Sequence, residues 1–210
     1  MTLKHPSFKV ETGRKIVVCG RYYIAAEDTP QQIAELIDII NRRENRSECV
    51  KTGEIFPGDQ ALVVANNKKL MSSPFVMKWG FDTGKGGLLI NCRSETAFEK
   101  PMFRELIAQR RLLVPASGYF EWQKMGKEKA KYALSPEEGC MYMSGIYRQG
   151  KYGMEFVILT RDAAPGIRFI HSRMPLILSE SDAYEWLKPD GNPLDVMKRA
   201  VENVNYIRMN

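Results

Sequence analysis

The sequence predicts an α+β fold in which a curled, largely antiparallel β-sheet or barrel-like core is flanked by a few helices. Two observations support this prediction. Many short β-favouring runs lie between turn residues, and only a few segments have the apolar spacing of an amphipathic helix. No repeat, low-complexity tract or long Pro/Gly/Ser linker divides the 210 residues. We therefore expect an N-terminal extension over residues 1–18 and a single domain over residues 19–210.

Each expected helix has an identifiable start or end. The first begins at Thr29–Gln32, which has the pattern of an N-cap, a proline in the first turn and a capping box, and its apolar spacing continues to Ile40. The second runs from about Pro101 to Gln109. The third begins at Ser179 and stops before Pro189, because the residue before a proline disfavours the helical conformation.

The remaining regular structure is expected as short strands. Each candidate is rich in β-branched or aromatic residues and is bounded by turn residues. The expected strands are Ile16–Ile24, Ala61–Ala65, Phe75–Phe81, Leu88–Arg93, Leu112–Trp122, Lys131–Leu134, Met141–Arg148, Glu155–Thr160 and Met174–Leu178.

Composition limits the class of protein. Hydrophobic residues make up 44% of the chain and charged residues 27%, as in ordinary globular proteins. No apolar run approaches the roughly 20 residues that span a bilayer, and charged residues interrupt the segment where a secretory signal needs an apolar stretch. The four cysteines include no close-set pair, so we expect reduced thiols in a cytoplasmic protein, with no metal site and no cofactor. Nothing indicates an obligate assembly, and we expect a monomer.

The net charge of +6 suggests an anionic partner. Half of this excess lies in the extension, where four basic residues face one glutamate. Net charge is therefore weak evidence for nucleic-acid binding, and that prediction depends on individual arginines.

Cys19 is the most informative of the cysteines. If the residues before it are removed, its α-amine and its thiol lie on adjacent carbons and together can capture an aldehyde. If they remain, the amine is part of a peptide bond and cannot react. Cys49, Cys92 and Cys140 are expected to be buried thiols.

His171 and Glu121 are candidates for proton transfer. The chain has two histidines, and His5 lies in the extension. A lone histidine is more often structural, but His171 stands in a loop with an arginine and a proline that enters a strand, which leaves both interpretations open. Glu121 lies among aromatic residues, where lost hydration raises a carboxylate pKa, unless it sits at a strand edge in water.

Asn91 and Arg93 are expected to point to the same side of one strand, an amide and a cation that converge, while Ile90 and Cys92 point away. An arginine there can hold a phosphate through two donors, although a lone arginine is more often a surface residue.

In combination these residues resemble the SRAP family, the SOS response-associated peptidase domain. The resemblance spans residues 19 to about 205. It rests on Cys19–Tyr22, Asn91–Thr96, Gly118–Trp122, Ile158–Thr160, Ile170–Pro175 and Val201–Val204, in the family's order.

The resemblance implies a sensor of abasic sites in single-stranded DNA, which associates with the nucleoid during DNA damage. It implies that the leader is lost, that the amine of Cys19 forms a Schiff base with the abasic-site aldehyde, and that the thiol closes a thiazolidine ring. An α-amine with a pKa of about 8 is substantially neutral at physiological pH, whereas a lysine near 10.4 is not. The thiol adds within one molecule and so has a large effective molarity.

The resemblance also implies residue roles. Cys19 is the nucleophile, Asn91 orients its amine or thiol, Glu121 moves protons during sugar-ring opening, and His171 assists opening and any reversal. The residues implied in DNA binding are Arg21, Pro57, Arg93, Ser94, Trp122, Thr160, Arg173 and Met174. Binding is expected to weaken with salt and to show little sequence preference.

The chain departs from the family pattern in two loops. Glu54–Gly58 stands where the family commonly has Asn-Val-Ala-Pro-Gly, so a carboxylate replaces an amide near the expected DNA and is expected to lower affinity. Asp82–Gly87 replaces a loop that in the family often carries a wedging tryptophan.

The internal position of Cys19 has two explanations. Cys19 attacks the carbonyl of Val18 and removes its own leader, or translation begins at Val17 or Val18. We expect the second.

Two other functions remain open from the sequence. The first is a thiol peptidase acting in trans through Cys19 and His171. The second is a noncovalent single-stranded DNA binder that does not need Cys19. Dependence on the free amine separates the covalent sensor from both.

Overall fold

The computed structural model describes residues 20–209 of the chain. Within these residues an eight-stranded sheet and a five-stranded sheet form the centre of the fold, and we call them the larger and the smaller sheet. The larger sheet has the strand order β13 (Arg173–Pro175), β12 (Gly153–Asp162), β4 (Ser72–Trp79), β3 (Gln60–Asn66), β8 (Arg111–Ala116), β11 (Met141–Gly150) and β14 (Ile177–Leu178). Because β12 also pairs with β11, this sheet closes into a barrel.

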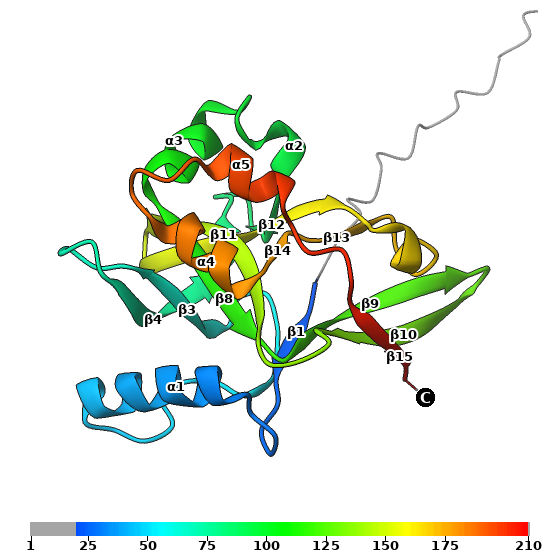
Figure 1. Ribbon diagram of the computed structural model, residues 1–210, viewed down its shortest axis with the longest axis horizontal. Helices are drawn as coiled ribbons and strands as arrows, with labels where there is room; N and C mark the ends of the chain where they lie inside the picture. Colours follow the sequence, from blue (N-terminus) through cyan, green and yellow to red (C-terminus); the bar gives the residue numbers. More distant parts are fainter. Residues whose placement is uncertain (1–19, 210) are drawn as a thin grey trace, which may run out of the picture.

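The smaller sheet has the order β15 (Asn205–Arg208), β10 (Glu128–Ser135), β9 (Gly118–Met125), β1 (Tyr22–Ile24) and β2 (Gly53–Ile55). Its strands pair antiparallel, and the β9–β10 hairpin projects away from the barrel (Figure 1). Strand β7 (Asn91–Arg93) is the eighth strand of the larger sheet and pairs in parallel with β12. Strand β5 (Phe81–Asp82) pairs with β6 (Leu88–Leu89) in a separate short hairpin.

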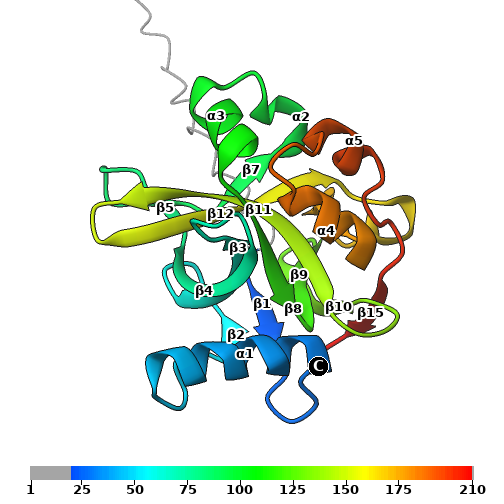
Figure 2. The same ribbon diagram turned by 60° about the vertical axis from the view of Figure 1, so that its left-hand side comes forward.

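Helix α1 (Gln31–Glu44) lies at one end of the barrel, opposite α2 (Ser94–Ala97), α3 (Pro101–Gln109) and α5 (Pro193–Lys198) (Figures 1 and 2). Helix α4 (Glu180–Leu187) packs with α3 and α5 around Trp186, and a 3₁₀ turn spans Pro165–Ile167. The predicted α+β class, with an antiparallel barrel-like core and outer helices, is confirmed.

The second and third helix predictions are confirmed, including the Ser179 cap, whose hydroxyl accepts a hydrogen bond from the backbone N–H of Asp182. The cap predicted for the first helix is wrong. Pro30 is the N-cap, and the Thr29 hydroxyl instead donates to the carbonyl oxygen of Ala25. The short strands β2 and β15 and the short helices α2 and α5 were not predicted, because each is too brief for a periodic pattern.

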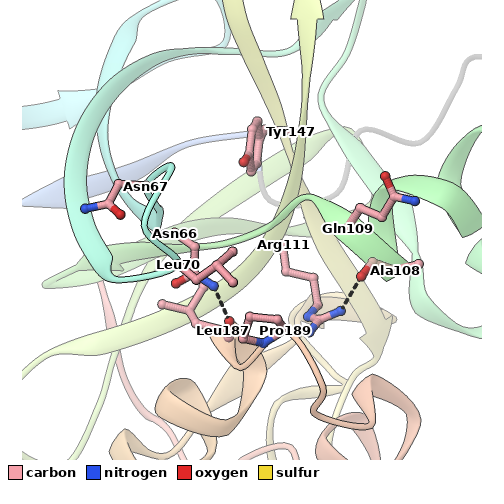
Figure 3. A pocket seen from close by; sticks show the side chains of 9 residues that line it. All are labelled: Asn66, Asn67, Leu70, Ala108, Gln109, Arg111, Tyr147, Leu187 and Pro189. Atoms are coloured by element: carbon pink, nitrogen blue, oxygen red, sulfur yellow. Dashed lines mark hydrogen bonds between the residues drawn. The ribbon is translucent and has the colours of Figure 1, made fainter.

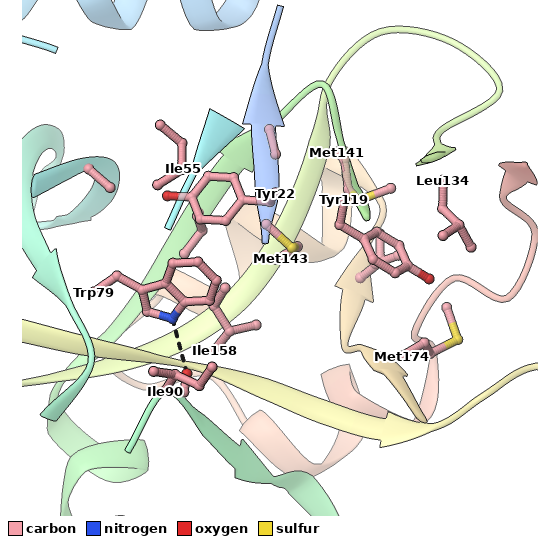
Figure 4. Packing of buried hydrophobic residues seen from close by; sticks show 14 of the residues in the cluster. Tyr22, Ile55, Trp79, Ile90, Tyr119, Leu134, Met141, Met143, Ile158 and Met174 are labelled. Carbon is pink, nitrogen blue, oxygen red and sulfur yellow. Dashed lines mark hydrogen bonds between the residues drawn. The ribbon is translucent and has the colours of Figure 1, made fainter. Parts of the chain in front are cut away.

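The interior between the two sheets is filled by aromatic and aliphatic side chains. Trp79 is fully buried, its indole N–H donates to the carbonyl oxygen of Ile90 over 3.1 Å, and its ring lies 5.1 Å from that of Tyr22 (Figure 4). Burying about 200 Å² of an aromatic side chain contributes roughly 5 kcal/mol before entropy is counted. This contact fixes β1 of the smaller sheet against the barrel.

Within the described residues, no helix has both the length and the apolar character needed to cross a bilayer.

Candidate functional site

Glu121 and His171 form a buried acid–base pair at the junction of the two sheets. Oε1 of Glu121 lies 3.6 Å from Nδ1 of His171, and the Glu121 side chain is only 6% exposed. Glu121 is on β9 opposite Tyr132, and the alternation of the strand turns it to the same face as buried Tyr119. The burial excludes the alternative of a strand-edge glutamate in water.

His171 is held by the backbone of the residues that follow it. The N–H of Arg173 donates to Nδ1 over 3.1 Å, which places the proton of the neutral ring on Nε2. Burial lowers the pKa of His171, and the positive charge of Arg173 acts in the same direction. The neutral ring at pH 7 therefore presents its Nε2–H as a hydrogen-bond donor.

Arg173 is buried and its charge is compensated by acidic partners. Its guanidinium donates to both carboxylate oxygens of Glu95, over 2.6 and 2.8 Å, and to Asp162 over 2.5 Å. Nη2 also donates to the backbone oxygen of Thr160 over 2.8 Å. These contacts join β12, β13 and α2, so Arg173 stabilises the loop that carries His171. Fully buried Met174, the next residue, accepts a hydrogen bond at sulfur from the N–H of Ala164.

Strand β7 brings the second group of predicted residues to β12. Asn91 lies opposite Ile158 and is half-buried, whereas Cys92 between Asn91 and Arg93 is turned into the core, as predicted. Arg93 is exposed and makes no ion pair with residues 20–209. Ser94 is half-buried at the start of α2, and buried Thr160 donates to the Cys92 carbonyl over 3.5 Å.

Cys19, the predicted nucleophile, lies outside the described residues. Burial raises the pKa of both Cys92 and Cys140 to about 12, so neither is a thiolate at neutral pH. The prediction that all three other thiols are buried is wrong for Cys49 and Cys140, which are half-buried.

Arg21 and Trp122 lie together on the opposite face of the smaller sheet. The guanidinium carbon of Arg21 is 5.1 Å from the centre of the Trp122 ring and 4.4 Å from that of Phe56. Glu54 accepts from Arg21 over 2.9 Å and from Lys131 over 2.7 Å. Pro57 follows in the adjacent turn and is half-buried.

The sequence analysis did not identify Lys131 or Phe56 as site residues. The register of β9 with β10 brings Lys131 opposite Trp122. A glycine between two β-favouring runs is a sequence signal for a hairpin turn, and Gly126 could have indicated this one. In the structure Gly126 has a φ of 62°, which such a turn requires.

A separate cavity of about 330 Å³ lies beside Arg111, Gln109 and Tyr147 (Figure 3). The Arg111 side chain donates through Nε, Nη1 and Nη2 to backbone carbonyl oxygens of residues 107, 108, 186 and 188. It therefore stabilises the C-terminal ends of α3 and α4, and these four bonds use four of the five N–H donors of the guanidinium. Among residues 20–209, no cluster of acidic, histidine and cysteine side chains has a metal-binding arrangement.

Known proteins are similar to this chain in sequence and in fold. A family model described as SOS response associated peptidase (SRAP) matches residues 18–209. The chain is 30% identical over 182 residues to "Abasic site processing protein YedK" of Escherichia coli (strain K12), with 82% of this chain and 81% of that protein covered. It is 27% identical over 195 residues to "Abasic site processing protein YoaM" of Bacillus subtilis (strain 168), with 86% and 84% covered.

A solved structure of a protein from Bacteroides thetaiotaomicron superposes with a TM-score of 0.74 at 23% identity, and covers 91% of this chain and 92% of that one. A phage-related protein from Bordetella bronchiseptica superposes with a TM-score of 0.72 at 21% identity, with 91% and 94% covered. Both have the same fold as the present chain.

Proposed function

The chain belongs to the SOS response associated peptidase family, and we propose that it captures abasic sites in single-stranded DNA by forming a thiazolidine through Cys19. The names of its relatives support abasic-site processing as the general activity. The observation that supports covalent capture through Cys19 is the buried Glu121–His171 pair beside the start of β1.

Chain connectivity supports this position for the reacting groups. Tyr22 of β1 pairs with Tyr119 of β9, two residues before Glu121. Three peptide units join Cys19 to Tyr22, so covalent geometry limits the distance between their Cα atoms to about 11 Å.

The reaction begins with opening of the sugar ring at the abasic site. We assign Glu121 to take the proton of the C1 hydroxyl and to pass it to the ring oxygen as the C–O bond breaks, which exposes the aldehyde. The Nε2–H of neutral His171 assists by donating a hydrogen bond to that oxygen. The neutral amine of Cys19 then attacks the aldehyde carbon, and loss of water leaves a C=N bond. The thiol adds to that carbon while its proton passes to nitrogen, which closes the ring.

Asn91 has an amide that can orient the amine or the thiol by hydrogen bonding. Among the predicted DNA contacts, Arg93 is the best placed to hold a phosphate, because its side chain is exposed and without an ion pair in residues 20–209. Arg173 is already paired with Glu95 and Asp162, and we propose that it contributes mainly by positioning His171. The remaining proposed contacts are Arg21, Pro57, Ser94, Trp122, Thr160 and Met174.

The test is a denaturing-gel assay with a single-stranded oligonucleotide that carries one abasic site. A chain beginning at Cys19 is compared with the 210-residue chain and with a chain beginning at Ala in place of Cys19. We expect a heat-stable adduct from the first alone, and Glu121→Gln in that chain should slow its formation by about 100-fold. No adduct from any chain would refute covalent capture and leave a noncovalent binder.

Removal of residues 1–18 is a separate proposal. We propose that the reactive form begins at Cys19, either through cleavage by its own thiol or through translation from Val17 or Val18. Intact-mass measurement of the purified 210-residue chain, together with its Cys19→Ala variant, tests self-cleavage. A mass loss in the first and not in the second would establish it, and no loss in either would refute it.

A further inference from the structure

The outer face of the smaller sheet, turned away from Glu121, carries alternating aromatic and basic side chains. Phe120, Trp122 and Lys124 alternate with inward residues along β9 and so share this face. On β10, Lys131 lies opposite Trp122 and Lys129 opposite Lys124. Strand geometry places side chains two residues apart about 7 Å from one another, so the cations form a row along the hairpin.

Three rings on this face, those of Phe56, Phe120 and Trp122, lie close to a cation. The Lys131 ammonium is 3.8 Å from the centre of the Phe120 ring, and Arg21 lies near both Trp122 and Phe56. Phe56 is 39% exposed and Trp122 is half-buried, whereas Phe120 is buried, so Phe56 and Trp122 are the rings that bases can reach. Aromatic rings interleaved with cations are the features by which proteins hold single-stranded nucleic acid, bases on the rings and phosphates on the cations.

Glu54 lies within this face and holds two of its cations. One carboxylate oxygen contacts Arg21 at 2.9 Å and the other contacts Lys131 at 2.7 Å. The two non-bridging oxygens of a phosphate can make the same pair of contacts. The three side chains are 27 to 35% exposed, so an incoming phosphate can reach them.

The geometry points to this outer face as a binding track for the single-stranded DNA that flanks the lesion. Successive phosphates bind along it to four cations, Arg21, Lys131, Lys124 and Lys129. In the free protein, the Glu54 carboxylate occupies one of these phosphate positions. The inference rests on the proposed DNA substrate but not on the covalent chemistry, since the track lies on the face opposite to the Glu121–His171 pair. An acidic protein segment would use the cations and leave the rings without partners, so DNA fits the face better.

The first experiment measures binding of undamaged single-stranded DNA by fluorescence anisotropy over a series of salt concentrations, which excludes any effect of covalent capture. The Lys124→Ala/Lys129→Ala double variant is compared with Lys68→Ala/Lys69→Ala, a matched loss of two exposed lysines in the turn between β3 and β4. With a slope of about 0.7 per phosphate contact, the hairpin variant should lose about 1.4 from the salt slope and bind roughly 25-fold more weakly near 0.1 M salt. Equal affinity and slope in the two double variants would overturn the proposal.

The second experiment tests the role of Glu54. Glu54→Gln keeps the size of the side chain and removes the charge that competes with phosphate, so we expect several-fold tighter binding of the same DNA. Wild-type or weaker affinity would show that Glu54 does not occupy a phosphate position. An oligoglutamate of equal charge should compete poorly, and equal competition would show that the rings do not contribute. A hairpin variant that binds DNA normally while the chain beginning at Cys19 still forms the adduct would refute the track and leave the proposed function intact.

Discussion

Replacing Arg173 with methionine should lower the free energy of unfolding by about 2 kcal/mol and raise the pKa of His171. Methionine keeps much of the apolar stem and removes the guanidinium. The lost contacts are the paired hydrogen bonds to Glu95, the bond to Asp162 and the bond to the Thr160 carbonyl.

The magnitude follows from the unequal exposure of the partners. The Arg173 side chain is 9% exposed, and breaking a fully buried ion pair costs about 3–5 kcal/mol. The carboxylates of Glu95 and Asp162 are 44% and 76% exposed, so water replaces much of what they lose. The Thr160 carbonyl is buried and stays without this partner. An intermediate value of about 2 kcal/mol results, which corresponds to roughly 4–8 °C in melting temperature for a domain of this size.

The assay is thermal unfolding at pH 7, with Arg199→Met as the control. Arg199 pairs with Asp182 at 2.6 Å but is itself 51% exposed. Asp182 is 12% exposed and keeps the hydrogen bond from the Ser179 hydroxyl, so the loss of Arg199 should cost about 1 kcal/mol. Burial acts to raise the pKa of Glu95, but the hydrogen bonds and charge of Arg173 lower it overall from 4.5. The stabilisation is therefore present above pH 4.5 and lost as pH falls through the lowered pKa, so the two Arg173 forms should converge in acid. Equal melting temperatures of the Arg173 and Arg199 variants would refute the reasoning.

Two further predictions concern backbone packing and protonation. Gly118→Ala should destabilise the protein by more than about 2 kcal/mol, because the added Cβ would lie 2.3 Å from the Leu134 carbonyl oxygen. Gly166→Ala is the control and should be nearly neutral, because its added Cβ would have no heavy atom within 4 Å. Urea unfolding of the two variants measures the difference. The pKa of His171 is lowered below 6.5, so stability due to its neutral form should be present above pH 6.5 and lost as pH falls through the folded-state pKa. His171→Gln should abolish this part of the pH dependence of unfolding, and an unchanged dependence would contradict it.

The sequence was sufficient for elements whose signals are local. Helix α3 ends where its apolar spacing ends, and α4 begins at Ser179 because one hydroxyl satisfies a free backbone N–H. The cap of α1 could not be decided locally. The Thr29 hydroxyl has two acceptable partners, and the turn that reaches back to Ala25 determines which one it takes.

The candidate site divides in the same way. The sequence by itself determined the residue types, namely a cysteine near the start of the first strand, a carboxylate among aromatic residues and one histidine beyond the extension. Only the tertiary structure showed that Glu121 lies next to His171 and that Arg173 is paired with acidic residues. It also showed that Glu54 contacts both Arg21 and Lys131. The physical reason is that burial and charge pairing depend on strand register between segments far apart in the chain, and alternation along one strand cannot show which partner lies across from it.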